Sequence, residues 1–383
     1  LNNCHVYLIK YNLSNFISTY PNIFTIFNYI LSIKIYIHTI YNNYFYEVDT
    51  IYYIDINPNE NTDITIPISI TNATIRTNGI GDYYGKIVVA SNRTSPLTLT
   101  IDNLIFGNGT STSGFIDFGN NNSYTLGKNI LIFSSTNAIN NITLNEPAIR
   151  VASNTSLIIT STSSSSTLTC TASDHGSGIG SGESETPGSI VIEGNGTINS
   201  TGGSYAAGVG GGANGNGGTI SLLQIYPGEL NAIGGLKLPE TLSPNNIADG
   251  GTGISGGSYC DSGVILINSS ANITAVGNDG GAGIGSGYGG DTIDISINLL
   301  APGTINATGL QYVSGIGSGS SLHNSGTACV ESNSGGSSRN ITIRGTGIIN
   351  AYGGSDSPGI GGENSCITIL EGININHIGG KNT

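Results

Sequence analysis

A short glycine motif recurs six times in the second half of the chain and constrains the fold more than any other feature. It starts at residues 178, 208, 253, 283, 315 and 359, and Gly178-Ile-Gly-Ser-Gly182 is a clear example. Successive starts are 30, 45, 30, 32 and 44 residues apart. Such self-similarity is typical of repeat architectures, in which one unit stacks on the next. The longer steps predict loops at Leu236–Asn246 and Leu322–Ser338.

Two short strands are expected between successive glycine motifs. The first kind reads Val264-Ile-Leu-Ile267, and the second kind reads Thr304-Ile-Asn-Ala-Thr-Gly309. Alternation of this kind puts every second side chain on one face, and it begins near residue 50. Glycine, asparagine and serine clusters separate the strands as turn signals. We therefore predict an all-β chain, a parallel β-helix (β-solenoid), which general connection rules make right-handed.

Composition divides the chain into three parts. Residues 1–50 are rich in isoleucine, tyrosine and asparagine and are expected to form an irregular N-terminal cap or extra strands. Residues 51–175 form the first solenoid part, with isoleucine- and threonine-rich strands, and residues 176–383 form the glycine-rich repeat. The apolar stretch Ile23–Tyr41 is interrupted by Asn28, Lys34 and His38, and a membrane span needs about 18 apolar residues. We favour a cap over a membrane anchor, and we expect no span in the solenoid.

One position of the second strand is repeatedly asparagine. It is occupied by Asn199, Asn231, Asn306 and Asn350, with Thr274 as the exception. A position that recurs once per unit forms a row along a solenoid, with neighbours about 4.8 Å apart. Asparagine amides at this spacing hydrogen-bond to one another in a ladder. We predict that this row is structural.

Asn-x-Ser/Thr sequons occur along the whole chain and are candidate N-glycosylation sites in a secreted eukaryotic protein. A chain rich in asparagine and threonine also produces sequons by chance. They lie at Asn12, Asn72, Asn92, Asn108, Asn121, Asn141, Asn154, Asn195, Asn199, Asn268, Asn272, Asn306 and Asn340.

Charge and cysteine content exclude several classes of function. Only 9% of residues are charged, the formal net charge is −13, and lysine and arginine form no cluster, so we expect no nucleic-acid partner. The odd number of cysteines leaves at least one without a partner in the same chain. Their spacing has no Cys-x-x-Cys pair, and we predict neither a metal site nor a cofactor. The cysteines are Cys4, Cys170, Cys260, Cys329 and Cys366.

Acidic residues are scattered, which argues against catalysis. β-helical polysaccharide lyases and hydrolases need clustered acids for acid–base chemistry. Asp291 and Asp294 are the one pair at short spacing within a repeat, and residues three apart on a strand point to opposite faces. We therefore predict no catalytic residue and no enzymatic activity. Carboxylates within about 6 Å of each other on one face of the solenoid would favour the enzymatic alternative.

Residues 60 to 380 resemble a known group of repeat proteins. The matching pieces are Ile70-Thr-Asn-Ala-Thr74, then Glu146-Pro-Ala-Ile-Arg-Val-Ala-Ser-Asn-Thr-Ser-Leu-Ile-Ile-Thr160, then a Ser/Thr tract, then the Gly-Ile-Gly-Ser-Gly and Ile-Asn-Ala-x-Gly units. In this order they resemble glycine-rich repeat proteins of gut Firmicutes and of protist surface families, often described as carbohydrate-binding-domain proteins. The resemblance implies a β-solenoid at the cell surface and supplies no catalytic residue.

These observations predict a non-catalytic extracellular or cell-surface protein with a structural or adhesive role. It would associate into fibres or with other surface proteins, because exposed solenoid ends favour growth. An alternative is a glycan-binding module that uses rows of asparagine and tyrosine, and a second alternative is a β-helical polysaccharide lyase or hydrolase. The tyrosines near expected corners are Tyr205, Tyr226, Tyr259, Tyr288, Tyr312 and Tyr352.

Overall fold

The described part of the structure consists of strands and turns. A computed structural model of the chain describes residues 38–40, 43–48, 51–56, 61–77, 82–91, 93–106, 114–119, 128–224, 228–236, 250–278, 280–310, 313–319, 336–355, 357–362 and 365–379. These residues form 32 strands and contain no helix. The all-β prediction is therefore confirmed for this part of the chain.

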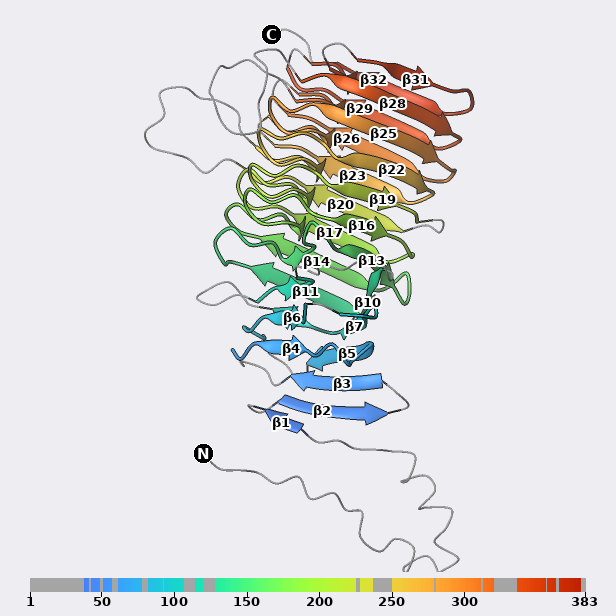
Figure 1. Cartoon of the computed structure of the whole chain (residues 1–383). Coiled ribbons are helices and arrows are strands. Elements are labelled where there is room, and N and C mark those ends of the chain that lie inside the picture. Colours follow the sequence, from blue (N-terminus) through green and yellow to red (C-terminus); the bar gives the residue numbers. More distant parts are fainter. Residues whose placement is uncertain are drawn as a thin grey trace, which may run out of the picture.

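The strands form three long sheets that run side by side along one stack of coils (Figure 1). Sheet A has 13 strands: β1 (His38–Ile40), β2 (Asn43–Val48), β3 (Ile51–Ile56), β5 (Asn72–Thr77), β7 (Thr98–Asp102), β10 (Asn129–Ser134), β13 (Ser156–Ser161), β16 (Ser189–Ile192), β19 (Thr219–Leu222), β22 (Val264–Ser269), β25 (Thr292–Leu299), β28 (Ser338–Gly345) and β31 (Ile367–Ile369). Sheet B has ten strands: β4 (Ile64–Ile66), β6 (Ile87–Val89), β9 (Ile116–Asp117), β12 (Ile149–Arg150), β15 (Ile179–Gly180), β18 (Val209–Gly210), β21 (Ile254–Ser255), β24 (Ile284–Gly285), β27 (Ile316–Gly317) and β30 (Ile360–Gly361). Sheet C has nine strands: β8 (Ile105–Phe106), β11 (Thr136–Asn141), β14 (Thr167–Ala172), β17 (Thr197–Thr201), β20 (Glu229–Ile233), β23 (Asn272–Val276), β26 (Thr304–Thr308), β29 (Ile348–Tyr352) and β32 (Asn374–Ile378).

The chain visits the three sheets in the same order in each coil, as in β15, β16 and β17, before it returns to sheet B at β18. From β3 onward each strand pairs in parallel with its equivalent in the next coil, as β17 does with β20. This arrangement is a parallel β-helix, as predicted. Its right-handed winding stays a prediction.

The N-terminal end of the stack departs from this pattern. β1 pairs antiparallel with β2, and β2 pairs antiparallel with β3, before parallel pairing begins between β3 and β5. Sheet A therefore starts with an antiparallel extension, which lies below the coils in Figure 1.

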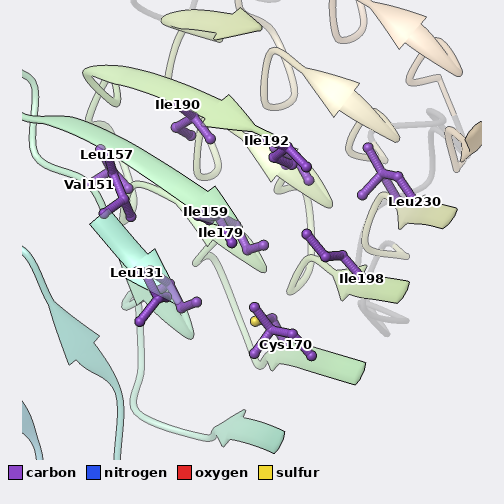
Figure 2. Close-up of a cluster of buried hydrophobic side chains, with 14 of the residues drawn as sticks. Leu131, Val151, Leu157, Ile159, Cys170, Ile179, Ile190, Ile192, Ile198 and Leu230 are labelled. Atoms are coloured by element: carbon purple, nitrogen blue, oxygen red, sulfur yellow. The ribbon is translucent and has the colours of Figure 1, made fainter. Parts of the chain in front are cut away.

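Isoleucine rows fill the interior. On sheet A one row places Ile190, Ile220, Ile265 and Ile295 in register, and each has at most 1% of its surface exposed. Figure 2 shows Leu157 and Ile190 from sheet A, Ile179 from sheet B and Ile198 from sheet C meeting inside the coils. Fully burying one such side chain contributes about 1.5–3 kcal/mol. Stability thus accumulates coil by coil.

A second row consists of glycines at a corner of sheet B. Gly180, Gly210, Gly285 and Gly317 occupy the same register position with positive φ, and Gly285 has φ of 141°. A Cβ on Gly285 would lie 1.8 Å from the carbonyl oxygen of Gly317. The motif therefore needs glycine both for backbone conformation and for close contact between coils.

Two earlier coils have charged residues at this row, Asp117 and Arg150, in register with Gly180. Ser255 takes the same place in β21 with φ of 116° and is fully buried. Its hydroxyl accepts a hydrogen bond from the Gly263 amide at 3.1 Å.

Gly285→Ala is expected to destabilise the protein by roughly 3 kcal/mol or more, because the methyl group adds both strain and overlap with the next coil. Chemical unfolding followed by circular dichroism measures this. Gly119→Ala is the matched control, since its Cβ would lie 3.5 Å from the nearest heavy atom, the Val89 carbonyl oxygen. Equal losses in both variants would contradict the close-contact explanation.

Candidate functional site

The outer face of sheet C is the most regular surface of the described structure. Alternate side chains of its strands point outward, and the register aligns them into three rows. The central row holds Ala138, Thr169, Asn199, Asn231, Thr274, Asn306, Asn350 and Asn376. One flanking row holds Thr136, Thr167, Thr197, Glu229, Asn272, Thr304, Ile348 and Asn374, and the other holds Asn140, Thr171, Thr201, Ile233, Val276, Thr308, Tyr352 and Ile378. Glu229 is the one acidic or basic side chain in these rows.

The asparagines of the central row hydrogen-bond to one another. Asn231 Nδ2 donates to Asn199 Oδ1 at 2.9 Å, and Asn350 Nδ2 donates to Asn306 Oδ1 at 2.8 Å. Asn376 Nδ2 extends the second run by donating to Asn350 Oδ1 at 2.8 Å. The four residues predicted to form a ladder thus lie in one row but in two runs, because Thr274 stands between Asn231 and Asn306.

Sequence reasoning missed Asn376. The signal was present, because Ile375-Asn376 repeats the pairs Ile305-Asn306 and Ile349-Asn350. The C-terminal pair was hidden because the small residues that follow the other asparagines are replaced by His377.

Thr274→Asn is expected to join the two runs and to stabilise the protein. The new amide would donate to Asn231 and accept from Asn306, the direction seen in the existing pairs, for a gain of about 0.5–1.5 kcal/mol per hydrogen bond. Thr308→Asn is the matched control, because it lies on the same face outside the central row. Unfolding free energies of both variants test this, and an equal gain in the two would contradict it.

The sequons fall into three groups in the structure. Asn154, Asn268, Asn272 and Asn340 are exposed, and Asn72, Asn195, Asn199 and Asn306 are half-buried. Asn268 Oδ1 accepts a hydrogen bond from Asn298 at 2.7 Å, and Asn340 Nδ2 donates to Asp294 at 2.8 Å. Asn12, Asn92, Asn108 and Asn121 lie outside the described residues.

Asn141 is a correction to the set of candidate glycosylation sites. It is 1% exposed, and its Nδ2 donates to the carbonyl oxygens of Glu146 and Pro147 at 2.9 and 2.7 Å. A glycan on Nδ2 would break these bonds and open the corner before β12. The folded structure therefore excludes a glycan at Asn141.

A cluster of charged side chains surrounds Arg150 on the outside of sheet B. Its guanidinium contacts Glu185 through Nη2 and Oε1 at 2.5 Å and through Nε and Oε2 at 3.2 Å. Arg150 Nη1 also lies 3.6 Å from Asp117 Oδ2. One guanidinium thus holds two carboxylates from different coils.

Burial changes the acidity of two carboxyl groups here. Desolvation raises the pKa of Asp117 above 3.8, although Arg150 opposes this effect. Desolvation also raises the pKa of Glu146 above 4.5, again against Arg150. Asp117 Oδ1 is buried without a hydrogen-bond partner.

Sequence reasoning did not find this cluster, which does bring carboxylates together. The expectation of scattered acids was wrong at this place, because the register joins residues that are far apart in sequence, as Arg150 and Glu185 are. Aligning Ile116-Asp117 and Ile149-Arg150 with Ile179-Gly180 would have revealed the charged pair. The bidentate pairing with Glu185 resembles an ion pair that fixes two neighbouring coils.

Asp117→Asn tests whether the raised pKa affects stability. A carboxyl group that binds its proton more tightly in the folded state stabilises that state at low pH, and this contribution is lost as the pH rises above 3.8 through the folded pKa. The unfolding free energy of wild type minus that of the variant is therefore expected to fall as the pH rises through this window. Glu146→Gln should show the same sign above 4.5. A difference that increases with pH would mean that the ion pair with Arg150 dominates.

The acidic pair Asp291 and Asp294 does not form a dyad. Asp291 Oδ1 accepts from the Ser337 amide at 2.8 Å, and its Oδ2 lies 3.2 Å from Arg339 Nη2. Asp294 accepts instead from Asn340. Both carboxylates are thus occupied in linking adjacent coils.

The tyrosines form no common platform among the described residues. Tyr288 is 4% exposed and packs edge-on against Tyr259, with ring centroids 5.7 Å apart. Tyr205 lies against His175 at 5.5 Å, and Tyr352 is 37% exposed on sheet C. Tyr226 and Tyr312 lie outside the described residues.

The cysteines differ in state. Cys260 is disulfide-bonded. Cys170 is a free thiol in the core, where burial raises its pKa well above the ordinary range, and Cys366 is free and exposed. Cys4 and Cys329 lie outside the described residues, among which no group of three His, Cys, Asp or Glu side chains is placed to hold a metal ion.

Comparisons with protein-family models, with curated proteins and with solved structures gave no match. The resemblance to glycine-rich surface repeat proteins therefore stays a prediction. Within the described ranges, the structure has no helix of the length and apolarity needed to cross a membrane.

Proposed function

We propose that this chain is a non-catalytic extracellular or cell-surface protein with a structural or adhesive role. The observation that carries the proposal is the continuity of the three sheets, which link coil to coil from β12 to β32 (Figure 1). A stack in which each coil contacts only its neighbours makes an extended, rigid body with a large outer surface. Such a body suits a role as a spacer or scaffold that presents its faces.

The state of Cys260 supports an extracellular location. A disulfide in a protein of this kind is typical of oxidising compartments, because cytosolic thiols are kept reduced. The exposed sequons agree with this location, since Asn154, Asn268, Asn272 and Asn340 are accessible on the outside of the coils.

The chemistry of the Arg150 cluster favours a structural role over catalysis. Asp117 and Glu185 both serve as ion-pair acceptors for one guanidinium. A carboxylate that holds two coils together in this way is not free to transfer protons to a substrate. The polysaccharide lyase or hydrolase alternative is therefore not part of the proposal.

Glycan binding is the second candidate, and the outer face of sheet C favours it. Threonine hydroxyls and asparagine amides recur there once per coil, with Glu229 as the one acidic or basic side chain in the rows. The ladder hydrogen bonds hold the amides in place, which lowers the entropy cost of binding. Uncharged hydrogen-bonding groups on a regular face suit an uncharged polysaccharide better than a charged one.

Mass spectrometry of the native material, before and after enzymatic deglycosylation, tests the proposal. If the host has an N-glycosylation pathway, glycans are expected at the four exposed sequons and not at Asn141, and Cys260 is expected in a disulfide. A reduced Cys260 with no sequon occupied would contradict the extracellular location. A glycan at Asn141 would contradict the folded structure itself.

The same preparation distinguishes the two candidate functions. A structural protein is expected to stay in the supernatant when it is mixed with insoluble polysaccharides, whereas a glycan-binding module would sediment with them. Loss of sedimentation in Thr169→Lys, with Thr98→Lys on sheet A as the control, would assign binding to sheet C and favour the second candidate.

A further inference from the structure

The C-terminal end of the coil stack exposes its interior. Ile341 and Ile343 in β28 are at most 1% exposed, whereas their partners in β31, Ile367 and Ile369, are 39% and 53% exposed. On sheet C, Ile378 is 57% exposed. The last coil therefore presents core side chains that every earlier coil covers with its successor (Figure 1).

The N-terminal end is different. The edge of β3 is paired with the antiparallel strand β2, which in turn pairs with β1. The first interior isoleucines of sheets A and B are covered, with Ile56 and Ile66 fully buried. This end of the stack does not present an open core.

The strands at the C-terminal end also lack protection against pairing. β30, β31 and β32 are the last strands of sheets B, A and C. They contain no lysine, arginine, aspartate, glutamate or proline, the residues that commonly protect sheet edges. Backbone groups and apolar side chains are thus open on the same end face.

The geometry limits what fits this face. A partner must supply an apolar cross-section bordered by three strand edges at matching positions. The C-terminal end of a second copy offers such a surface, and the N-terminal end does not, because its core is covered. Contact between identical surfaces requires a twofold axis and closes after two subunits.

We propose that two copies associate tail to tail through β30, β31 and β32, with both N-terminal ends pointing outward. This inference rests on the self-association that is part of the proposed function and names its partner and its limit. The product is a closed pair, because a fibre needs two open ends.

Sedimentation velocity over a concentration series tests the contact. Wild type is expected to form a dimer, and Ile369→Lys is expected to weaken dimerisation by roughly 100-fold or more, because two charges are buried at the contact. Ile378→Lys should act alike. Ile68→Lys is the matched control, since Ile68 is 54% exposed near the N-terminal end, and it should dimerise as wild type does.

Electron microscopy of the dimer with a gold label at the N-terminus tests the orientation. Tail-to-tail pairs are expected to carry labels at both outer ends. Cys366 is exposed next to β31, so the same experiments on Cys366→Ser exclude a thiol cross-link as the source of the dimer.

Three results would overturn the inference: a monomer at all concentrations, a label in the middle of the pair, or equal weakening by Ile68→Lys. A rod that is glycosylated on its exposed sequons yet monomeric would leave the proposed surface role intact. Failure of the inference is thereby distinguishable from failure of the function.

Discussion

In-register parallel pairing between coils is the constraint on which the rest of the structure depends. Because each coil aligns with the next, any residue type that recurs once per coil becomes a continuous row. Inward rows of isoleucine make the core, a corner row of glycine permits close contact between coils, and an outward row of asparagine forms hydrogen-bonded runs. A defect in one coil is therefore a local interruption, as Thr274 is in the asparagine row.

The same constraint lets one fold carry different chemistry in its two halves. At one corner position the early coils place Asp117 and Arg150, and later coils place glycine with positive φ. The early coils hold neighbouring turns together with an ion pair, and the later ones rely on close backbone contact. The exchange leaves the sheets uninterrupted, because the corner side chains point away from the shared core.

The two ends of the stack matter more for association than its length does. A repeat fold without caps offers open edges at both ends, and such edges favour unlimited growth. Here β2 and β1 cover the first coil, while Ile369 and Ile378 stay exposed on the last. This asymmetry converts the fibre expected from sequence into a closed pair. The flat, almost uncharged outer face of sheet C stays available along the whole pair.

The amino-acid sequence by itself determined the strand content, the parallel solenoid and the position of the asparagine row, because period-two alternation and the glycine repeat are local patterns that the stacking copies faithfully. Only the tertiary structure decided which distant residues meet. The pairing of Arg150 with Asp117 and Glu185, the burial of Asn141 and the different states of the two ends all arise from register between coils. The sequons show the same division: sequence located every one, but exposure depends on which corner each asparagine occupies.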